Sequence, residues 1–164
     1  MAQCRCHRCP GASTRQRRKS QKRGSEAQGI GRSKGGLTTK LHGVCDSLGL
    51  PLRFVSSPGH RGEVLFGAEL IKGYKPNYVI ADRAYDAEHF HDAILDLGAT
   101  PVIPPRHNRL RPHTCDWTIY KERNAIERLF NKLKHFRRVA TRYDKLLANF
   151  MGFVTIAAIH ILIR

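Results

Sequence analysis

The residues best suited to chemistry lie between positions 120 and 134. At about 100° per residue, a helix over this segment places four polar side chains within roughly 60° of one another: Tyr120, Arg123, Glu127 and Lys134. Apolar side chains form a separate sector: Ile126, Leu129, Phe130, Leu133 and Phe136. Glu127 is therefore expected beside the core, where its carboxylate can reach a metal ion. Taken alone, the pattern also fits ion pairs on a helix surface, which stabilise little.

A second carboxylate, Asp82, follows the apolar run Tyr78–Ala81. Because this run has no polar alternation, it predicts a strand that is buried on both faces and ends at Asp82. Asp86 is expected to begin the next helix, which extends to Leu97 and is closed by Gly98.

The other elements alternate in type along the chain. Hydrophobic periodicity assigns a hairpin over 37–44 and 51–55, a helix over 63–72, a strand over 100–104, and helices over 119–141 and 145–163. This order predicts an α/β fold in which a mixed sheet is flanked by helices. The uncharged run 146–163 is long enough for a membrane span, but Asn149, Thr155 and His160 favour a buried helix.

The chain carries a large excess of positive charge. Its 29 Lys and Arg against 13 Asp and Glu give a formal net charge of +16, which opposes folding unless a polyanion offsets it. Nucleic acid is the natural partner. A membrane is the rival polyanion, but no signal peptide or early apolar run follows Met1. We therefore predict a cytoplasmic, nucleoid-associated protein with no membrane partner.

Residues 1–36 differ in composition from the rest of the chain. They hold one acid, Glu26, and a basic block over 15–23, which predicts a disordered arm and a glycine-rich hinge. One domain is then expected over 37–164. The cluster from Cys4 to Cys9 has the residue types of a zinc site, but no second pair of ligands follows at loop distance. No zinc site is predicted.

The spacing Y-x-x-R-x-x-x-E-x-x-x-x-x-x-K from Tyr120 to Lys134 is similar to the signature of bacterial insertion-sequence transposases of the DDE type. Three more segments resemble the same family: 35–40 (GGLTTK), 80–86 (IADRAYD) and 140–145 (ATRYDK). The resemblance runs from about Gly24 to Arg164. It implies a ribonuclease-H-like fold, which agrees with the order of elements predicted above.

The resemblance also implies a chemistry. Two divalent ions held by carboxylates activate a water or a 3′-hydroxyl and stabilise the leaving oxygen, and Mg²⁺ or Mn²⁺ suits such ligands. Asp82 and Glu127 would be the second and third acids of the triad and the metal ligands. Arg123 and Lys134 would contact the DNA backbone near the cut, and Tyr120, the third DNA-binding residue, would pack against the backbone or orient it. The implied function is DNA transposition: cleavage and strand transfer of double-stranded DNA at terminal inverted repeats, compatible with a homo-oligomer on the DNA.

The first acid of the triad is missing from its expected place. It should lie on a strand before the glycine hinge, yet residues 1–45 hold no Asp, and Glu26 and Asp46 are poorly placed. The first strand is therefore predicted to be missing or degraded by a frameshift or a displaced start. Two functions stay open, an active transposase and an inactive remnant that only binds DNA. A basic RNA-binding protein is a third, although no RNA-recognition motif supports it.

Overall fold

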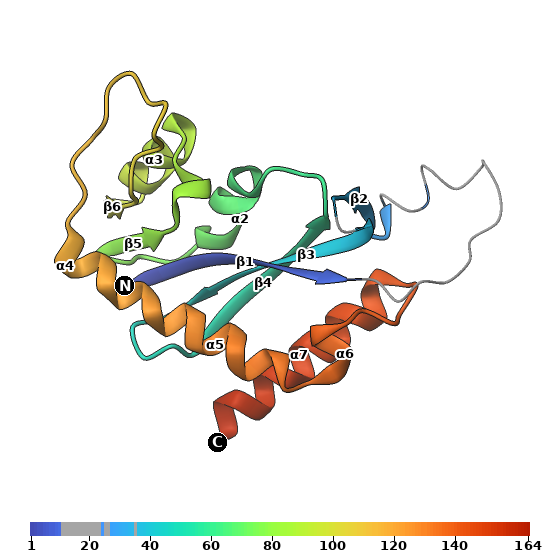
Figure 1. The fold of residues 1–164 in the computed structure, drawn as a ribbon. Helices are drawn as coiled ribbons and strands as arrows, with labels where there is room; N and C mark the ends of the chain where they lie inside the picture. Colours follow the sequence, from blue (N-terminus) through green and yellow to red (C-terminus); the bar gives the residue numbers. More distant parts are fainter. Residues whose placement is uncertain (11–23, 25–26, 35) are drawn as a thin grey trace. The chain divides into compact units, whose positions relative to one another are not determined.

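A six-stranded sheet organises the fold. The computed structural model describes residues 1–10, 24, 27–34 and 36–164. The strands are β1 (Ala2–Pro10), β2 (Gly31–Ser33), β3 (Gly36–Cys45), β4 (Pro51–Pro58), β5 (Tyr78–Ala81) and β6 (Thr100–Val102). They are hydrogen-bonded in the order β2-β3-β1-β5-β6, and β4 also pairs with β3 (Figure 1).

The sheet is mixed, as the sequence predicts. β1 and β5 run parallel, with Cys4 opposite Ala81, and β5 and β6 are also parallel, whereas β2 and β3 are antiparallel. The predicted hairpin of β3 and β4 is confirmed. In its turn the Asp46 carboxylate accepts a hydrogen bond from the Leu50 amide at 2.8 Å. Gly49 has a φ of 82°, a left-handed conformation that favours glycine.

Helices lie between and after the strands. They are the 3-10 helix Glu63–Phe66, α2 (Gly67–Ile71), the 3-10 helix Arg83–Tyr85, α3 (Glu88–Asp96), α4 (Trp117–Tyr120), the 3-10 helix Lys121–Arg123, α5 (Asn124–Lys134), α6 (Arg137–Ala140) and α7 (Leu147–Ile163). The single helix predicted over 119–141 is interrupted after Lys134, because Phe136 has extended backbone angles of −84° and 102°. Among the helices that the structure describes, none is long and apolar enough to cross a membrane.

The chain divides into two compact units. Unit 1 comprises Met1–Arg5, His42–Val55 and Gly62–Leu129, and unit 2 comprises Cys6–Leu41, Ser56–Arg61 and Phe130–Arg164. Strands β1, β3 and β4 and helix α5 therefore contribute residues to both units.

In unit 1, the first residues of β1 are covered on both faces. Successive side chains of a strand point to opposite faces, and Ala2 and Cys4 are buried in a core that also includes Val79 and Phe90. Gln3 is buried on the other face, where its Oε1 accepts a hydrogen bond from the Ile126 amide of α5 at 3.0 Å. Helices thus flank the unit 1 part of the sheet, as the sequence predicts.

The beginning of the chain corrects two sequence predictions. A strand, β1, lies where the first strand is predicted to be missing or degraded, although none of its residues is acidic. The disordered arm predicted over 1–36 is likewise replaced at β1 and β2 by regular structure. The physical reason is that small side chains, Ala2 and Cys4, alternate with longer polar ones, which suits a strand between two layers. The basic block 15–23 and Glu26 lie outside the described residues.

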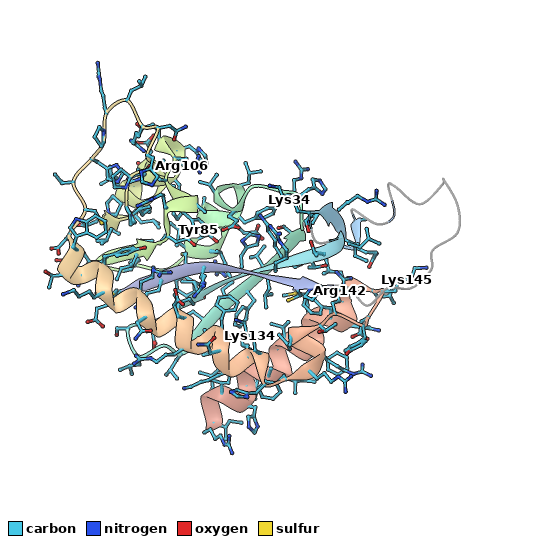
Figure 2. All side chains as sticks on the ribbon, in the orientation of Figure 1. Lys34, Tyr85, Arg106, Lys134, Arg142 and Lys145 are labelled. Atoms are coloured by element: carbon cyan, nitrogen blue, oxygen red, sulfur yellow. The ribbon has the colours of Figure 1, made fainter. Side chains whose placement is uncertain are left out.

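Unit 2 contains a buried arginine, Arg142, from the segment that resembles the family. Its side chain donates to Thr39 Oγ1 at 2.7 Å and to the Asp144 and Lys145 carbonyl oxygens at 2.9 Å. The guanidinium also lies over the Phe150 ring, 5.2 Å from its centroid. Figure 2 labels Arg142 and, in the same segment, Lys145. Because a buried guanidinium is stable only when its donors are used, this network gives the 140–145 segment a structural role.

Candidate active site

A cavity in unit 1 gathers three of the residues predicted from the sequence. It has a volume of about 360 Å³ and is lined by Asp82, Arg83, Ala84, Pro104, Trp117, Tyr120 and Arg123. Asp82 follows β5, as predicted, and its Oδ1 accepts a hydrogen bond from the Ala84 amide at 2.9 Å. This bond caps the following 3-10 helix and fixes the carboxylate at the end of the strand.

One wall of the cavity is aromatic. The Trp117 and Tyr120 rings meet edge to face at 5.7 Å, and the Arg123 guanidinium lies 5.4 Å from the centroid of the Tyr120 ring. Asp116 starts this wall, because its Oδ1 accepts from the Thr118 amide at 2.9 Å and caps α4. Trp117 remains 57% exposed. The wall therefore combines an accessible indole face with a guanidinium, a pairing suited to nucleic acid.

Glu127 lies on α5, one turn after Arg123. Arg123 Nη1 contacts Glu127 Oε1 at 2.7 Å, and Arg5 Nη1 forms an ion pair with Oε2. Burial alone would raise the pKa of Glu127, but the Arg5 and Arg123 guanidiniums lower it below its usual value. Glu127 is therefore an anion near neutral pH, with both carboxylate oxygens bonded to arginines.

Arg5 is the site residue that sequence reasoning missed. The register pairs Cys4 with Ala81, so Arg5 of β1 lies at the level of Asp82, the residue after β5. It points to the same face as Gln3, toward α5, where it contacts Glu127. The alternation of residues 2–5 could have indicated this strand, but the arginines favoured a disordered arm.

The two carboxylates differ in their electrostatic surroundings. Burial and the nearby Glu63 carboxylate raise the pKa of Asp82, and the lowering effects of Arg123 and Arg5 do not overcome them. Glu127 is shifted in the opposite direction. A pair of acids with opposed shifts is typical of functional sites, although ion-pair networks produce the same result.

The prediction that Asp86 begins the next helix is wrong, because α3 starts after Ala87. The Asp86 carboxylate is instead buried and accepts from the Arg106 amide at 2.7 Å, and it forms an ion pair with Arg109. His91 Nε2 lies 3.2 Å from the same carboxylate. These contacts hold the basic segment after β6 beside the cavity of Asp82.

Asp86 is also part of a possible metal-binding group. With His91 and His113 it has ligand atoms that lie within 4.8 Å of one another, but the Arg109 guanidinium already supplies the positive charge there.

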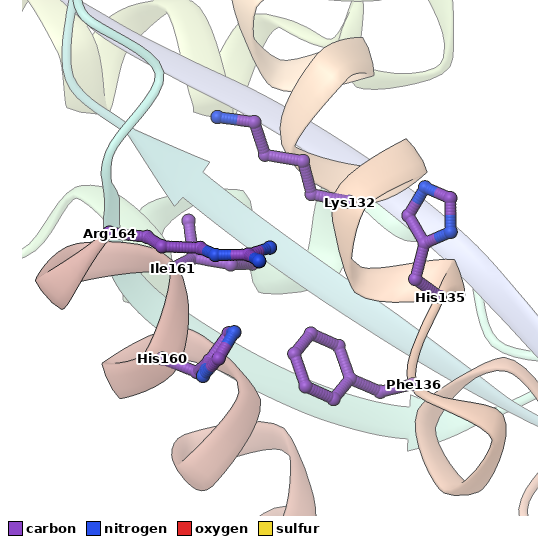
Figure 3. A pocket seen from close by; sticks show the side chains of 6 residues that line it. All are labelled: Lys132, His135, Phe136, His160, Ile161 and Arg164. Carbon is purple, nitrogen blue, oxygen red and sulfur yellow. The ribbon is translucent and has the colours of Figure 1, made fainter.

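Unit 2 has a cavity of its own, with a different lining. It has a volume of about 690 Å³ and is lined by Lys132, His135, Phe136, His160, Ile161 and Arg164 (Figure 3). The Phe136 and His160 rings meet edge to face at 5.5 Å. Lys134, the remaining residue of the predicted pattern, is exposed at the end of α5 in unit 2 and does not line this cavity.

Comparisons with known proteins decide the family. The family model of the transposase DDE domain matches residues 5–162. The chain belongs to the DDE transposase domain family. It is 48% identical over 130 residues, 78% of this chain and 100% of the relative, to a Brucella ovis protein named as a candidate transposase for insertion sequence element IS6501. It is 31% identical over 119 residues, 65% of this chain and 54% of the relative, to a Burkholderia cepacia protein so named for element IS402.

The fold of this DDE transposase domain is also found in a solved structure. The piggyBac transposase synaptic complex with hairpin DNA matches with a TM-score of 0.61 at 10% identity, over 96% of this chain and 44% of that one. This likeness, with the observed strand order, confirms the α/β, ribonuclease-H-like fold.

The family implies a divalent metal, but among the described residues neither Asp82 nor Glu127 belongs to a group of three side chains that could hold one. Metal ions of this type need several oxygen ligands, and β1 supplies no carboxylate beside Asp82. A guanidinium has only N–H donors and cannot act as a ligand, and two of them bond to Glu127. Asp82 follows β5 and Glu127 lies on α5, the places that the resemblance implies for two acids, and an arginine lies beside them.

Proposed function

We propose that this chain binds double-stranded DNA in insertion-sequence transposition, with the Asp82 cavity as the contact for the strand backbone at the terminal inverted repeats. One observation supports this most strongly. Tyr120 and Arg123, which belong to the family pattern, line the same cavity as Asp82. The net charge of +16 adds the non-specific attraction that DNA binding requires.

Each residue of the cavity wall has a role in this proposal. The guanidinium of Arg123 can bond two phosphate oxygens at once, which positions the backbone. The Tyr120 ring packs against that guanidinium through a cation–π contact and restricts its position. The exposed indole of Trp117 offers a stacking surface for a base that leaves the duplex near a strand end. Lys134, on the surface of unit 2, is proposed as a further phosphate contact.

A second candidate function is strand cleavage with Mg²⁺ or Mn²⁺ held by Asp82 and Glu127. The observation in its favour is that Asp82 directly follows β5 and Glu127 lies on α5, the places that the family pattern implies for two acids. The ion pairs of Glu127 count against it. A homo-oligomer assembled on the DNA is compatible with either function.

The chain offers a direct probe of the proposed DNA contact, because Trp117 is its only tryptophan. We expect that titration of a terminal-repeat duplex in EDTA changes Trp117 emission and saturates. Arg123→Ala should weaken this binding about ten-fold, the loss expected for a charged hydrogen bond. Arg128→Ala is the matched control, because Arg128 is an exposed arginine of the adjoining helix α5 and lies outside the cavity. Binding that leaves Trp117 emission unchanged, or that falls equally in both variants, would refute the proposed contact.

A further inference from the structure

We infer that the Arg5 guanidinium takes the place of a divalent metal in this chain, and that it keeps such ions out of the site formed by Asp82 and Glu127. The inference rests on the proposed function, because it concerns the same cavity. It makes DNA binding independent of metal. It also assigns the loss of the metal site to one side chain, whose replacement by an acid should restore it.

The position of Arg5 supports this inference first. Parallel pairing of β1 with β5 brings Arg5 to the level of Asp82, and its Nη1 reaches Glu127. The same register places Arg5 beside Asp82, so its positive charge acts on that carboxylate as well. One guanidinium therefore interacts with both acids that the family pattern implies, which is the electrostatic role of a bound cation.

The strand that carries Arg5 is held in place. Gln3, two residues earlier on the same face, is fully buried and accepts a hydrogen bond from the Ile126 amide. Cys4 is buried in the core on the opposite face. Because both neighbours are packed, β1 cannot carry Arg5 away from Glu127 without breaking these contacts. A metal ion would therefore have to displace the guanidinium itself.

Arg5 and Arg123 both bond to Glu127, but they are not equivalent. Arg123 belongs to the pattern that resembles the family, and it lies against the Tyr120 ring in the 3-10 helix that directly precedes α5 and Glu127. Arg5 comes from β1, the strand on which the resemblance implies an acid. An arginine where the resemblance implies an acid makes the surroundings of Asp82 more positive by two charge units, and this positive charge repels a metal ion. Arg5, and not Arg123, is therefore the residue that excludes the ion.

The test uses Tb³⁺, an oxygen-seeking ion whose luminescence is sensitised by a nearby tryptophan, here Trp117 in the same cavity as Asp82. Each variant is titrated with Tb³⁺ in the absence of DNA, and Mn²⁺ is then added as a competitor. We expect no saturable signal from the wild type. Arg5→Asp should bind at least ~100-fold more tightly, and Arg5→Gln, which removes the positive charge alone, about ten-fold more tightly. Mn²⁺ should displace Tb³⁺ from both variants.

Two controls assign the gain to the site. Arg8→Asp makes the same change of charge at an exposed position of the same strand and should match the wild type. Asp82→Asn added to Arg5→Asp should abolish the gain. Saturable binding to the wild type that is lost in Asp82→Asn would overturn the inference, as would folded Arg5→Asp and Arg5→Gln variants without a gain. If Arg5→Asp fails to fold, Arg5→Gln decides by itself.

The same samples separate this inference from the proposed function. DNA binding is measured in EDTA by Trp117 emission, where no metal contributes. Wild-type protein that binds both DNA and Tb³⁺ would contradict the role of Arg5 and leave the DNA contact intact. Wild-type protein that binds neither would contradict the DNA contact and leave the role of Arg5 intact.

Discussion

The two cavities are both lined by cationic side chains, but only the cavity of unit 1 also contains a carboxylate. There Asp82 accepts from a backbone amide, and Arg123 is held by Tyr120 and Glu127. The six residues that line the unit 2 cavity include no acid. Charges of both signs in one network fix the orientation of each group, whereas cations alone attract a polyanion without orienting it. The first cavity is therefore suited to a defined contact and the second to general attraction.

The largest expected effect is a loss of stability on removal of the buried Arg142 side chain from unit 2. Arg142→Ala should lower the free energy of unfolding by about 3 kcal/mol or more, because several buried acceptors lose their donor and a void opens beside Phe150. Urea unfolding followed by circular dichroism measures this loss. Arg61→Ala removes an exposed arginine of the same unit and is the control. Equal stability losses in the two variants would show that the buried network does not support unit 2.

Unit 1 depends in a similar way on Asp86. Burial would raise the pKa of Asp86, but the Arg106 amide and the Arg109 guanidinium lower it below the usual value of 3.8. Its contribution to stability is therefore fully present above pH 3.8 and is lost as the pH falls through the lower, folded value. Asp86→Asn should cost about 2 kcal/mol at pH 7 and less under acid, as measured by unfolding at both pH values. A pH-independent loss would contradict the ionised network.

The contrast between oriented and unoriented cations can be tested on DNA binding. Arg123→Lys keeps the charge but loses the planar guanidinium, and should weaken binding about ten-fold. Lys132→Arg in the unit 2 cavity should leave affinity unchanged. Lys132→Ala should mainly lower the dependence of affinity on salt, by about 0.9 in the logarithmic slope for one lost phosphate contact. Equal effects of the two conservative substitutions would remove the distinction between the cavities.

The smallest effect is a gain in stability. Because the folded pKa of Asp82 is raised, its ionised form disfavours the folded state as the pH rises through that value. Asp82→Asn should therefore raise the free energy of unfolding at pH 7 by about 0.5–1 kcal/mol. The gain should disappear below pH 3.8, where the carboxyl is protonated in both states. Thermal unfolding of the wild type and Asp82→Asn at pH 7 and pH 3 measures this difference. A loss of stability at pH 7, or a gain that persists at pH 3, would contradict the prediction.

The sequence predicted those parts of the fold that rest on local pattern. The apolar run before Asp82 and the hairpin around Asp46 are strands and a turn in the structure, because periodicity and turn chemistry act over a few residues. β1 was not predicted, because its arginines suggested a disordered arm. The alternation of small and polar side chains in it is short, and it indicates a strand only once the pairing with β5 is known. The long helix was predicted without its break at Phe136, which no turn residue marks.

The candidate site was predicted only in part, for the same reason. Asp82, Tyr120 and Arg123 follow from a spacing in the sequence, and the cavity brings them together. Arg5 could not be found in this way, because its role arises from the register of two strands far apart in the sequence. Asp86 was predicted as a helix start because an acid before a helix looks the same whether it caps the helix or binds Arg109.

The most direct test of the central claim is a nicking assay on a labelled duplex that carries the terminal repeat of the element. The wild type, Asp82→Ala and Glu127→Ala are compared in Mg²⁺, in Mn²⁺ and in EDTA, with DNA binding measured in parallel. We predict that the wild type binds the duplex equally in all three conditions and cleaves it in none. Metal-dependent cleavage that is abolished by either substitution would contradict the account, because it would show that the site holds its metal despite Arg5.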